Sequence, residues 1–465
     1  ATAAPDRSRD VKAFPLAPGD LPAARALVER GEYADARAAY LRLLAHDPTH
    51  FAVLNEFATL AQATGYRSAA LTAMRQAVAH HPDEPIGHVN LANLLLEDGD
   101  ALAAKAHCAE ALRLSPGFAP AHQAMARALD ELGDPAAEAH RDAGFTGHAT
   151  VVRAFRGRGA AIPILLLVSA RQGNIATAAW FDDRVHAVTA IYTEYWDAGP
   201  LPTHRLVVNA VGDADLSGRA LARAADICAR TPAPVINPPA RVVATGRAGN
   251  ATRLACISGC RIPAVATLPA DTLRSARDLA FPLLVRRPGF HTGRHFRLVE
   301  TAASLDPCLA TLGVAGTDDV LVISYLDARG ADGMARKYRV MFIDGQLYPV
   351  HLAISADWKV HYFTAAMADA PQHRAEEQRF LADMPAVVGP KAMAALTAIR
   401  DDLQLDYGGV DFGLGADGEL LFFEANATMV LIPPDPDPIW DYRRPAIAAA
   451  RQAVARMLAR RLEAR

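Results

Sequence analysis

Two carboxylates and one amide near the end of the sequence have the types and the spacing of a metal-binding set. Asp411 interrupts the apolar run VDFGL, and Glu424 and Asn426 stand two residues apart in a second run, ELLFFEANA. The intervening GADG is a turn signal, so we expect a β-hairpin that brings Asp411 beside Glu424. Side chains two apart leave the same face of a strand. Such hard oxygen ligands suit Mg²⁺, which completes its coordination with water and nucleotide phosphates.

The alternative is an ordinary hairpin whose acids face solvent. We favour the metal-binding interpretation because the run FFEAN surrounds Glu424 with apolar neighbours. A glutamate embedded in such a strand needs a partner. Holding these groups in place requires a folded framework, which the rest of the chain must supply.

Length and composition limit the class of protein. A chain of 465 residues exceeds one compact core, so about two to four domains are expected. The formal net charge of −3 argues against a protein that coats nucleic acid. No apolar run reaches membrane-spanning length and no signal sequence is recognisable, so we expect a cytoplasmic protein. The cysteines are scattered, which argues against a disulfide framework, and Cys256 and Cys260 lack the partners of a zinc site.

Residues 21–147 repeat at a period of 34. The glycines that keep this step are Gly31, Gly65, Gly99 and Gly133, and columns of alanine and proline keep it as well. Glycine bends the chain between two helices and proline ends the second, so the pattern predicts antiparallel helix pairs. The register resembles the tetratricopeptide repeat (TPR), with roughly three and a half copies. Two interpretations stay open: a groove for a peptide or partner protein, and a structural or dimerising lobe.

After residue 160 the pattern changes to alternating strands and helices. The runs IPILLLVSA, AVTAIYTEY, RLVVNAVGD and APVIN read as strands, and LSGRALARAADICAR reads as an amphipathic helix. This pattern predicts a small parallel α/β domain. Gly173 and Asn174 follow its first strand and can face a ligand at the strand's carboxyl end.

The D-x12-E-x-N arrangement of the hairpin resembles the metal-binding end of the ATP-grasp ligases, the superfamily of glutathione synthetase and D-alanine–D-alanine ligase. The resemblance extends over about residues 160–435. It implies ATP and Mg²⁺ as cofactors, with Asp411, Glu424 and Asn426 as the metal ligands.

The resemblance also implies residues that contact the ATP phosphates. Arginine stands where relatives carry lysine: Arg247 near the start of a helix, and Arg286 and Arg287 at the end of the strand FPLLVRR. An arginine can satisfy phosphate with two hydrogen bonds. The loop that follows contains Gly289 and Gly293 and has the composition of a flap whose backbone amides cradle phosphate.

The run VLVISYLDARGAD takes the place of the hinge that holds adenine in the relatives. The resemblance implies that Tyr325 and Leu326 bind adenine through their backbone and that Asp327 lies near the ribose. Arg339 stands where relatives direct an arginine at the γ-phosphate and the acyl phosphate. We expect Arg339 to be catalytic, with Lys337 as its companion on the same strand face. For Lys337 a structural salt bridge is the alternative.

Polar residues in two segments are expected to face the substrate. His291 and Arg294 lie in the glycine-containing loop, and His351, Lys359 and His361 lie in an unusually polar and aromatic run. The alternatives are a solvent-exposed basic flap for the first pair and a solvated loop for the second group.

The sequence therefore predicts an all-α helical-hairpin repeat (TPR-like) lobe, then an α/β pre-ATP-grasp domain and an α+β ATP-grasp domain. The expected segments are a flexible tail (1–20), the TPR-like repeats (21–147), a linker (148–160), the pre-ATP-grasp domain (161–240), the ATP-grasp domain (241–438) and a C-terminal helix that serves as a lid or dimer element (439–465).

The implied function is ADP-forming ligation of a carboxylate to an amine through an acyl phosphate, on an amino-acid, peptide or peptide-like substrate that the repeat lobe helps to present. The expected partners are those two substrates, a peptide or protein in the repeat groove and a second copy in a homodimer, with no nucleic acid and no membrane. Two alternatives stay open: a degenerate nucleotide-binding scaffold or interaction protein, and an ATP-grasp kinase.

Overall fold

The structure is a computed structural model that describes residues 20–197, 199–288, 295–360, 365, 367–435 and 437–463. Residues 1–19 of the expected tail lie outside the described residues. The chain divides into two compact units, Ala1–His148 and Ala149–Arg465. No helix within the described ranges has the length and apolar character needed to cross a bilayer.

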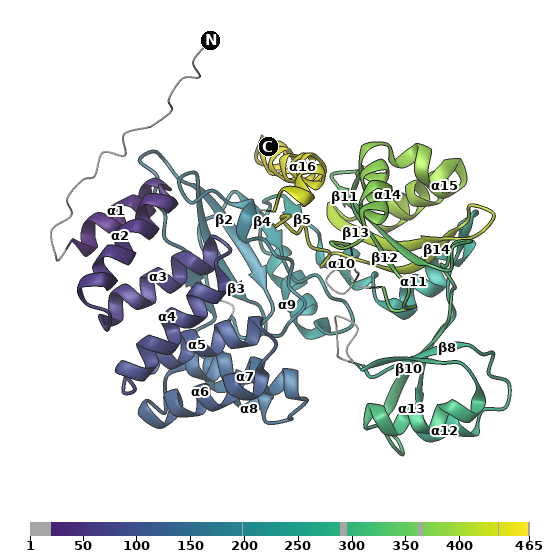
Figure 1. Cartoon of the computed structure of the whole chain (residues 1–465), viewed down its shortest axis with the longest axis horizontal. Helices are drawn as coiled ribbons and strands as arrows, with labels where there is room; N and C mark the ends of the chain where they lie inside the picture. The colour runs from purple at the N-terminus through teal and green to yellow at the C-terminus, as the bar shows by residue number, and fades with distance from the viewer. Residues whose placement is uncertain are drawn as a thin grey trace, which may run out of the picture. The chain divides into compact units, whose positions relative to one another are not determined.

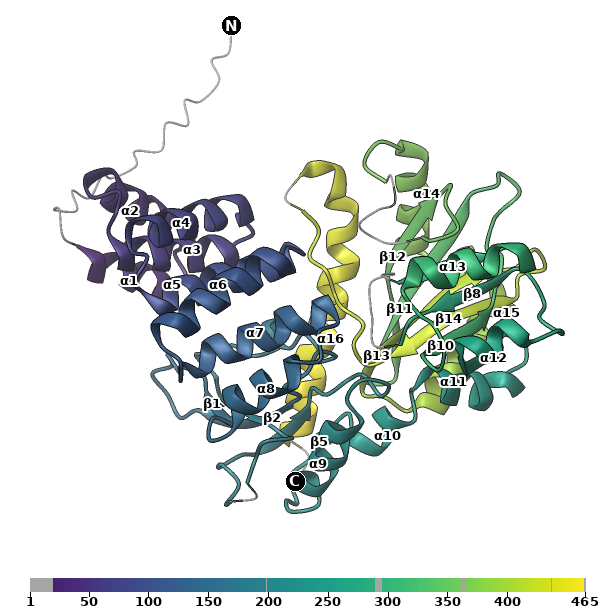
Figure 2. The same ribbon diagram turned by 90° about the horizontal axis from the view of Figure 1, so that it is seen from below.

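The first unit is a succession of helix pairs, coloured purple to blue in Figures 1 and 2. Its helices are α1 (Leu21–Arg30), α2 (Tyr33–His46), α3 (Phe51–Ala63), α4 (Arg67–His80), α5 (Pro85–Glu97), α6 (Ala101–Leu114), α7 (Ala119–Leu132) and α8 (Ala137–Phe145). The helical-hairpin repeats expected from the period are therefore present.

The repeated residues explain these boundaries. The four glycines of the repeat, Gly31, Gly65, Gly99 and Gly133, all have a positive φ, between 70° and 85°. Only glycine takes this backbone conformation without steric cost, so each one turns the chain from the first helix of a pair into the second. Alanines at the repeated positions, such as Ala36, Ala70 and Ala104, are fully buried and let neighbouring helices approach closely.

Two equivalent histidine pairs lie inside this lobe. The Nδ1 atoms of His88 and His107 are 3.1 Å apart, and those of His122 and His140 are 2.9 Å apart. His88 and His122 each place Nε2 at 2.9 Å from a proline carbonyl, which makes Nε2 the protonated nitrogen of the neutral ring. Burial, and next the charge of the paired ring, lower the pKa of His107 and of His140.

We expect these pairs to make the repeat lobe sensitive to acid. A histidine whose pKa is lower in the folded state contributes stability at neutral pH, and that stability is lost as the pH falls through the unfolded value of about 6.5. Thermal unfolding of the full chain should therefore lose a few degrees more in Tm between pH 7.5 and pH 5.5, as an order of magnitude, than the double variant His107→Gln/His140→Gln loses. Parallel curves for the two proteins would contradict this.

The second unit begins with a five-stranded sheet in the order β1-β3-β2-β4-β5. The strands are β1 (Thr150–Val152), β2 (Ile162–Val168), β3 (His186–Tyr192), β4 (Leu206–Asn209) and β5 (Val235–Ile236), with the short helix η1 (Ala178–Trp180) and the helices α9 (Gly218–Cys228), α10 (Pro239–Val243) and α11 (Arg247–Arg253) between or after them. All pairs are parallel except β1 with β3. The parallel domain expected from the sequence is present, whereas Thr150–Val152, expected to be linker, joins the sheet as an edge strand.

Alternation along β2 explains why this sheet is covered on both faces. Ile164 and Leu166 belong to one buried cluster, while Leu165 and Leu167 belong to another. Successive side chains point to opposite faces, so a continuous apolar run supplies both cores. Polar residues, among them Ser169, Thr193 and Asn209, lie at the carboxyl ends of the parallel strands and are buried.

A second, smaller sheet has its own core. It has the order β7-β10-β8-β9, formed by β7 (Val265–Pro269), β8 (Leu283–Arg286), β9 (Phe296–Val299) and β10 (Asp319–Ser324). The helices α12 (Ala270–Ser275) and α13 (Leu305–Leu312) pack on one face of this sheet, as Figure 1 shows. The other face is left available to a ligand.

The third sheet carries the hairpin with the candidate metal ligands. Its order is β12-β11-β13-β14-β6, formed by β6 (Cys260–Arg261), β11 (Ala335–Ile343), β12 (Gln346–Ser355), β13 (Tyr407–Leu414) and β14 (Leu420–Asn426). The turn between β11 and β12 has Asp344 and Gly345 at positive φ, 51° and 75°, as a two-residue Asp-Gly turn requires. Both predicted hairpins, β11–β12 and β13–β14, are antiparallel.

Helices cover one face of this third sheet (Figure 1). They are α14 (Pro371–Ala382), α15 (Met384–Leu403) and α16 (Arg444–Glu463), the last preceded by the short helix η4 (Pro438–Arg443). Tyr338 of β11 stacks on Phe412 of β13 and meets Phe380 of α14 edge-on. Residues of α16, including Met457, are buried in the same core. The C-terminal helix is thus part of the core of this unit rather than a detachable lid.

A buried ion pair fastens the C-terminal segment. Glu377 is fully buried and accepts hydrogen bonds from Arg443 at 2.7 Å, from the hydroxyl of Tyr442 at 2.5 Å and from the backbone nitrogen of Leu352 at 3.3 Å. Burial raises the pKa of Glu377, although Arg443 opposes that shift.

Arg443→Gln is expected to lower the free energy of unfolding by about 3–5 kcal/mol, because it leaves the charge of Glu377 buried without its cation. Arg444→Gln is the matched control, since Arg444 pairs with Asp441 at the surface and such pairs contribute about 0–1 kcal/mol. Urea unfolding measures both variants. The double variant Glu377→Gln/Arg443→Gln should recover much of the loss, and equal losses in the single and double variants would contradict the explanation.

Candidate functional site

Four charged or titratable residues form one row across the third sheet. In cross-strand register His351 of β12 pairs with Arg339 of β11, Arg339 pairs with Asp411 of β13, and Asp411 pairs with Glu424 of β14. Directly opposed residues share a face, so the four side chains leave the sheet on the same side. That side is opposite the face on which the aromatic residues of the same strands pack against α14.

Asp411 is held by two cations. Arg339 donates hydrogen bonds from Nε and Nη2 to the two carboxylate oxygens at 2.6 and 2.8 Å, and Lys337 Nζ lies 3.2 Å from Oδ2. Asp411 is 4% exposed. Burial acts to raise the pKa of Asp411, but the charges of Arg339 and Lys337 outweigh burial and hold it well below its ordinary value. The carboxylate is therefore ionised at neutral pH.

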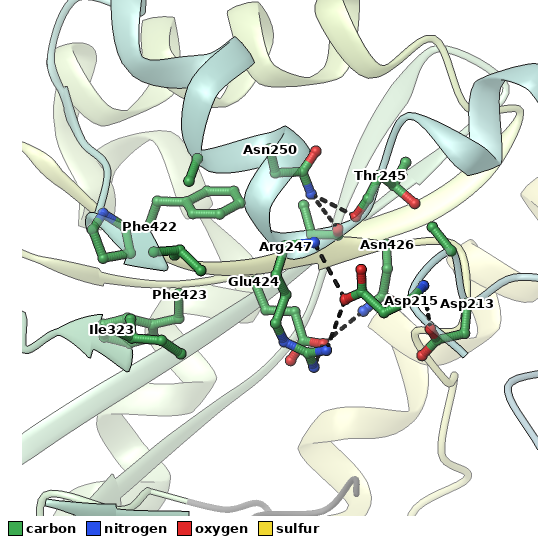
Figure 3. A pocket seen from close by; sticks show the side chains of 15 residues that line it. Asp213, Asp215, Thr245, Arg247, Asn250, Ile323, Phe422, Phe423, Glu424 and Asn426 are labelled. Atoms are coloured by element: carbon green, nitrogen blue, oxygen red, sulfur yellow. Dashed lines mark hydrogen bonds and ion pairs between the residues drawn. The ribbon is translucent and has the colours of Figure 1, made fainter. Parts of the chain in front are cut away.

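Glu424 is joined to the first sheet of this unit by Arg247. The guanidinium donates to Glu424 Oε1 at 2.7 Å and to Asp215 Oδ2 at 3.1 Å (Figure 3). The charge of Glu424 is the main cause that raises the pKa of Arg247. Asn426 donates from Nδ2 to the same Oε1 at 2.9 Å, and its own Oδ1 accepts from the backbone and hydroxyl of Thr428. The predicted hairpin thus presents Glu424 and Asn426 side by side.

Of these residues, Arg247, Lys337, Arg339, Asp411, Glu424 and Asn426 line one pocket of about 630 Å³. The cationic side chains that line it are Arg247, Arg286, Arg336, Lys337, Arg339 and Lys359, and the acidic ones are Asp213, Asp411 and Glu424. Among the described lining residues the cations exceed the acids by three. Burial, and next the charge of Arg247, lower the pKa of Arg286 to about 10, so Arg286 still carries its charge at neutral pH. A pocket with this balance attracts anions.

The pocket also has apolar lining residues. They are Pro263, Leu284, Ile323, Phe422 and Met429, with the aromatic rings of Phe296, Tyr325 and Trp358. The rings of Phe296 and Trp358 meet edge-on with centroids 5.4 Å apart. A small-molecule site commonly joins a broad apolar surface to a few placed polar groups. This pocket accommodates a ligand with a flat apolar part and a strongly anionic part.

The structure brings together most of the residues that the sequence singled out. Those that line the pocket are Arg247, Arg286, Tyr325, Leu326, Lys337, Arg339, Lys359, Asp411, Glu424 and Asn426. Arg287 and Asp327 do not line it. The backbone nitrogen of Arg287 donates to the carbonyl of His295, and Asp327 is exposed and pairs with Arg329 at 3.3 Å.

His351 departs from its expected place. We expected it to face the substrate, but it is 3% exposed and does not line the pocket. Burial, and next the charge of Arg339, lower the pKa of His351 well below its ordinary value. Alternation along β12 places His351 on the same sheet face as Arg339. At the β12 edge of the sheet other parts of the chain cover that face, so the ring does not reach the pocket. The ring is thus a neutral buried neighbour of Arg339.

Gly289, His291, Gly293, Arg294 and His361 lie outside the described residues. Their expected roles toward phosphate and substrate therefore stay predictions.

Sequence reasoning missed two acids and one amide. Asp213 and Gln172 line the pocket beside Gly173 and Asn174, and Asp215 pairs with Arg247. Both acids lie in the loop after β4, beyond the carboxyl end of a parallel strand, where ligands of such sheets bind. That position in the sequence could have identified Asp213 as a residue near a ligand. Nothing local marks Asp215 as the partner of Arg247, 32 residues away.

The donor set fits Mg²⁺ in its chemistry. Two carboxylates on opposed strand positions and an amide on the same face offer hard oxygen ligands, and Mg²⁺ needs few of these from protein. Among the described residues no group of three or more histidine, cysteine, aspartate and glutamate side chains could hold a metal. Glu424 Oε1 here accepts from Arg247, so a metal at that oxygen requires the guanidinium to shift toward another anion. The amide oxygen of Asn426 accepts from Thr428, so it too would have to exchange partners to bind a metal.

No protein-family model matches this chain, and no curated protein sequence matches it. Solved structures that match include a crystal structure of MamA (17% identity, 26% of this chain and 72% of that one, TM-score 0.25). Others are TTC0263, described as a thermophilic TPR protein in Thermus thermophilus (23% identity, 27% and 71%, TM-score 0.24), and YrrB, described as a TPR protein with an unusual peptide-binding site (16% identity, 26% and 64%, TM-score 0.25). TM-scores at this level carry no argument, so the repeat architecture rests on the helices themselves.

Proposed function

We propose that this chain binds ATP with Mg²⁺ and uses it to join a carboxylate to an amine. The observation that carries the proposal is the pocket of about 630 Å³, whose lining combines six cationic side chains with apolar and aromatic ones. The cationic side chains suit a triphosphate, and the apolar and aromatic ones suit a purine. The resemblance of the β13–β14 hairpin to the ATP-grasp ligases supports the same assignment.

The proposed phosphoryl transfer is mainly a task of positioning and charge neutralisation. A carboxylate oxygen of the substrate attacks the γ-phosphorus, the bond to the bridging oxygen breaks, and ADP leaves. Arg339 and Lys337 lie on one strand face beside Asp411, where they neutralise charge on the transferred group. Arg247 and Arg286 hold the remaining phosphate charge. Mg²⁺, when bound by Asp411, Glu424 and Asn426, supplies further charge neutralisation and orients the phosphates.

In the second step the amine nitrogen attacks the acyl carbon. The carbon–oxygen bond to phosphate breaks, phosphate leaves with the electron pair, and the nitrogen releases one proton to water. No covalent nucleophile of the protein takes part. The pocket needs instead to keep the acyl phosphate away from bulk water, a task for which its apolar lining residues are suited.

One observation favours a second candidate, a nucleotide-binding scaffold without turnover. Both carboxylates of the donor set are already paired with protein cations, Asp411 with Arg339 and Lys337, and Glu424 with Arg247. A degenerate site that no longer takes a metal shows the same pairing. The two candidates differ in whether ATP is consumed.

For the repeat lobe we propose the binding of a peptide or partner protein. Helical-hairpin repeats stack into curved arrays whose concave face is a common binding surface. This part of the proposal is independent of the ligase chemistry.

The test is substrate-stimulated release of ADP and phosphate with Mg²⁺ and ATP, against a panel of amino acids and short peptides. Hydroxylamine is added in parallel, because this small nucleophile captures an acyl phosphate as a hydroxamate whatever the natural amine is. Hydroxamate formation supports the ligase. ATP binding by calorimetry without ADP release supports the scaffold, and a stable phosphorylated product would indicate a kinase. No binding of ATP would overturn all three assignments of the pocket.

A further inference from the structure

Arg247 joins two carboxylates, of which only one is a candidate metal ligand. Its Nη2 donates to Glu424 Oε1 at 2.7 Å, and its Nη1 donates to Asp215 Oδ2 at 3.1 Å (Figure 3). Glu424 lies on β14 of the third sheet, whereas Asp215 lies in the loop after β4 of the first sheet. Arg247 also lines the pocket, and its side chain is 19% exposed, so a ligand there can reach the guanidinium.

Several charges act on the guanidinium of Arg247. The charge of Glu424 is the main cause that raises the pKa of Arg247, and the charges of Asp215 and Asp213 add to it against burial. The cation that it opposes is Arg286, whose pKa the charge of Arg247 helps to lower. Because acids other than Glu424 also act on Arg247, the guanidinium keeps an anionic environment when Glu424 is exchanged for another anion.

The carboxylate of Asp215 is held at the start of α11 by the backbone as well as by the side chain of Arg247. Its Oδ2 accepts from the backbone nitrogen of Arg247 at 3.3 Å in addition to the guanidinium. A Cβ added at Gly246 would lie 2.8 Å from Asp215 Oδ1, so glycine leaves the room that this carboxylate occupies. The backbone nitrogen of Asp215 donates to Asp213 Oδ1 at 2.9 Å. Asp215 therefore keeps its place, and its hold on the guanidinium, when Glu424 is released.

Glu424 cannot serve Arg247 and a metal ion through the same oxygen. Its Oε1 accepts from Arg247 and from Asn426 Nδ2, at 2.7 and 2.9 Å. A divalent cation at this oxygen would meet the positive charge of the guanidinium at contact distance, where repulsion between like charges is strongest. A phosphate offers Arg247 another anion, whose oxygens match the guanidinium fork. A nucleotide that brings such a phosphate would free the oxygen that the metal needs.

We propose that Arg247 blocks the metal site of the nucleotide-free protein and that Asp215 is the positioning residue on which Arg247 turns from Glu424 to a phosphate. The inference rests on the proposed binding of ATP with Mg²⁺ and adds a coupling to it. Glu424 becomes available to the metal when a phosphate takes its place on Arg247, and by linkage the metal in turn favours the phosphate. The pairing of Glu424 with Arg247 is thus the resting state of a working site and not the sign of a degenerate one.

The first test measures metal binding without nucleotide, by electron paramagnetic resonance of free Mn²⁺ titrated with the full chain. Arg247→Met removes the guanidinium from Glu424 and should raise the affinity for Mn²⁺ at least about 10-fold, within the usual range of coupling between sites. A variant that fails to fold cannot show such a gain. The gain should disappear in Arg247→Met/Glu424→Gln.

Arg336→Met is the matched control for loss of a cation. Arg336 also lines the pocket, but its ion pairs are with Asp332 and Glu376. Its substitution leaves Glu424 paired with Arg247, so the affinity for Mn²⁺ should change less than about 3-fold. No gain in Arg247→Met, an equal gain in Arg336→Met, or a gain that persists in Arg247→Met/Glu424→Gln would overturn the proposal.

The second test measures the role of Asp215 by calorimetric titration of ADP into the full chain with EDTA present. Loss of a negative charge would by itself strengthen the binding of an anion. Asp215→Asn should instead weaken ADP binding about 3- to 10-fold, because Arg247 loses the partner that orients it. Arg247→Met should weaken it about 10- to 100-fold, and Arg247→Met/Asp215→Asn should be no weaker, since Asp215 acts through Arg247.

Asp226→Asn, at an exposed acid on α9 paired with Arg223, is the matched control for loss of an acid. It should leave ADP binding within about 2-fold, as surface ion pairs contribute little. Unchanged or tighter ADP binding in Asp215→Asn, or additive losses in the double variant, would overturn the positioning role of Asp215.

The outcomes also separate this inference from the proposed function. A gain in Mn²⁺ affinity in Arg247→Met, together with a wild-type protein that binds ADP and forms no hydroxamate, would leave the block by Arg247 standing and remove the ligation. Hydroxamate formation by wild type, with no gain in Mn²⁺ affinity in Arg247→Met, would leave the ligation standing and remove the block.

Discussion

Glu424→Gln is expected to lower ATP-dependent phosphate release at least about 100-fold while the fold is retained. Glu424 stands opposite Asp411 in the row of charges and accepts from both Arg247 and Asn426. The change keeps the shape of the side chain and removes the charge that a metal requires. Arg247 keeps its second partner, Asp215, so no buried cation is stranded. Steady-state phosphate release and Mg²⁺-dependent binding of an ATP analogue measure the effect.

Glu419→Gln is the matched control for this variant. Glu419 belongs to the same hairpin, pairs with Arg261 and does not line the pocket. Its substitution should leave turnover within about 2-fold, as surface ion pairs contribute little. Turnover in Glu424→Gln equal to that of the control would show that Glu424 holds no catalytic metal.

Arg339→Met is expected to lower kcat by about 100- to 1000-fold, the effect of removing one preorganised contact to developing charge. Arg339 donates two hydrogen bonds to Asp411, so its loss also leaves that buried carboxylate with Lys337 alone. We therefore expect a further loss of about 3–5 kcal/mol in the free energy of unfolding. Single-turnover kinetics and urea unfolding separate the two effects.

Arg339→Lys separates the effect of Arg339 on stability from its effect on kcat. Lysine retains the charge and loses the planar fork that matches a carboxylate or a phosphate. We expect a smaller stability loss than in Arg339→Met, with kcat still reduced by at least about 10-fold. Arg274→Met, on α12 in an exposed pair with Asp271, is the control for loss of an arginine. A kcat in Arg339→Lys equal to that of wild type would restrict Arg339 to a structural role.

Short sequence patterns were sufficient to predict the helix pairs of the first unit and the hairpins of the third sheet. The period of 34 placed glycines where the chain turns at positive φ, and each helix pair of the first unit turns there. The Asp-Gly signal at Asp344 and the alternation of the strands predicted both hairpins of the third sheet. These features depend on backbone conformations and side-chain periods that a few adjacent residues determine.

The sequence also determined which strand face each candidate side chain takes, and it brought Asp411 beside Glu424. Only the tertiary structure decided what those side chains meet. Arg247 reaches Glu424 across 177 positions of sequence, and Arg339 reaches Asp411 across 72. His351 shares the face of Arg339 but is buried, while Asp213 was overlooked and lines the pocket. Alternation sets the direction of a side chain, whereas the covering of a face and the pairing of charges depend on how distant segments pack, which no local pattern encodes.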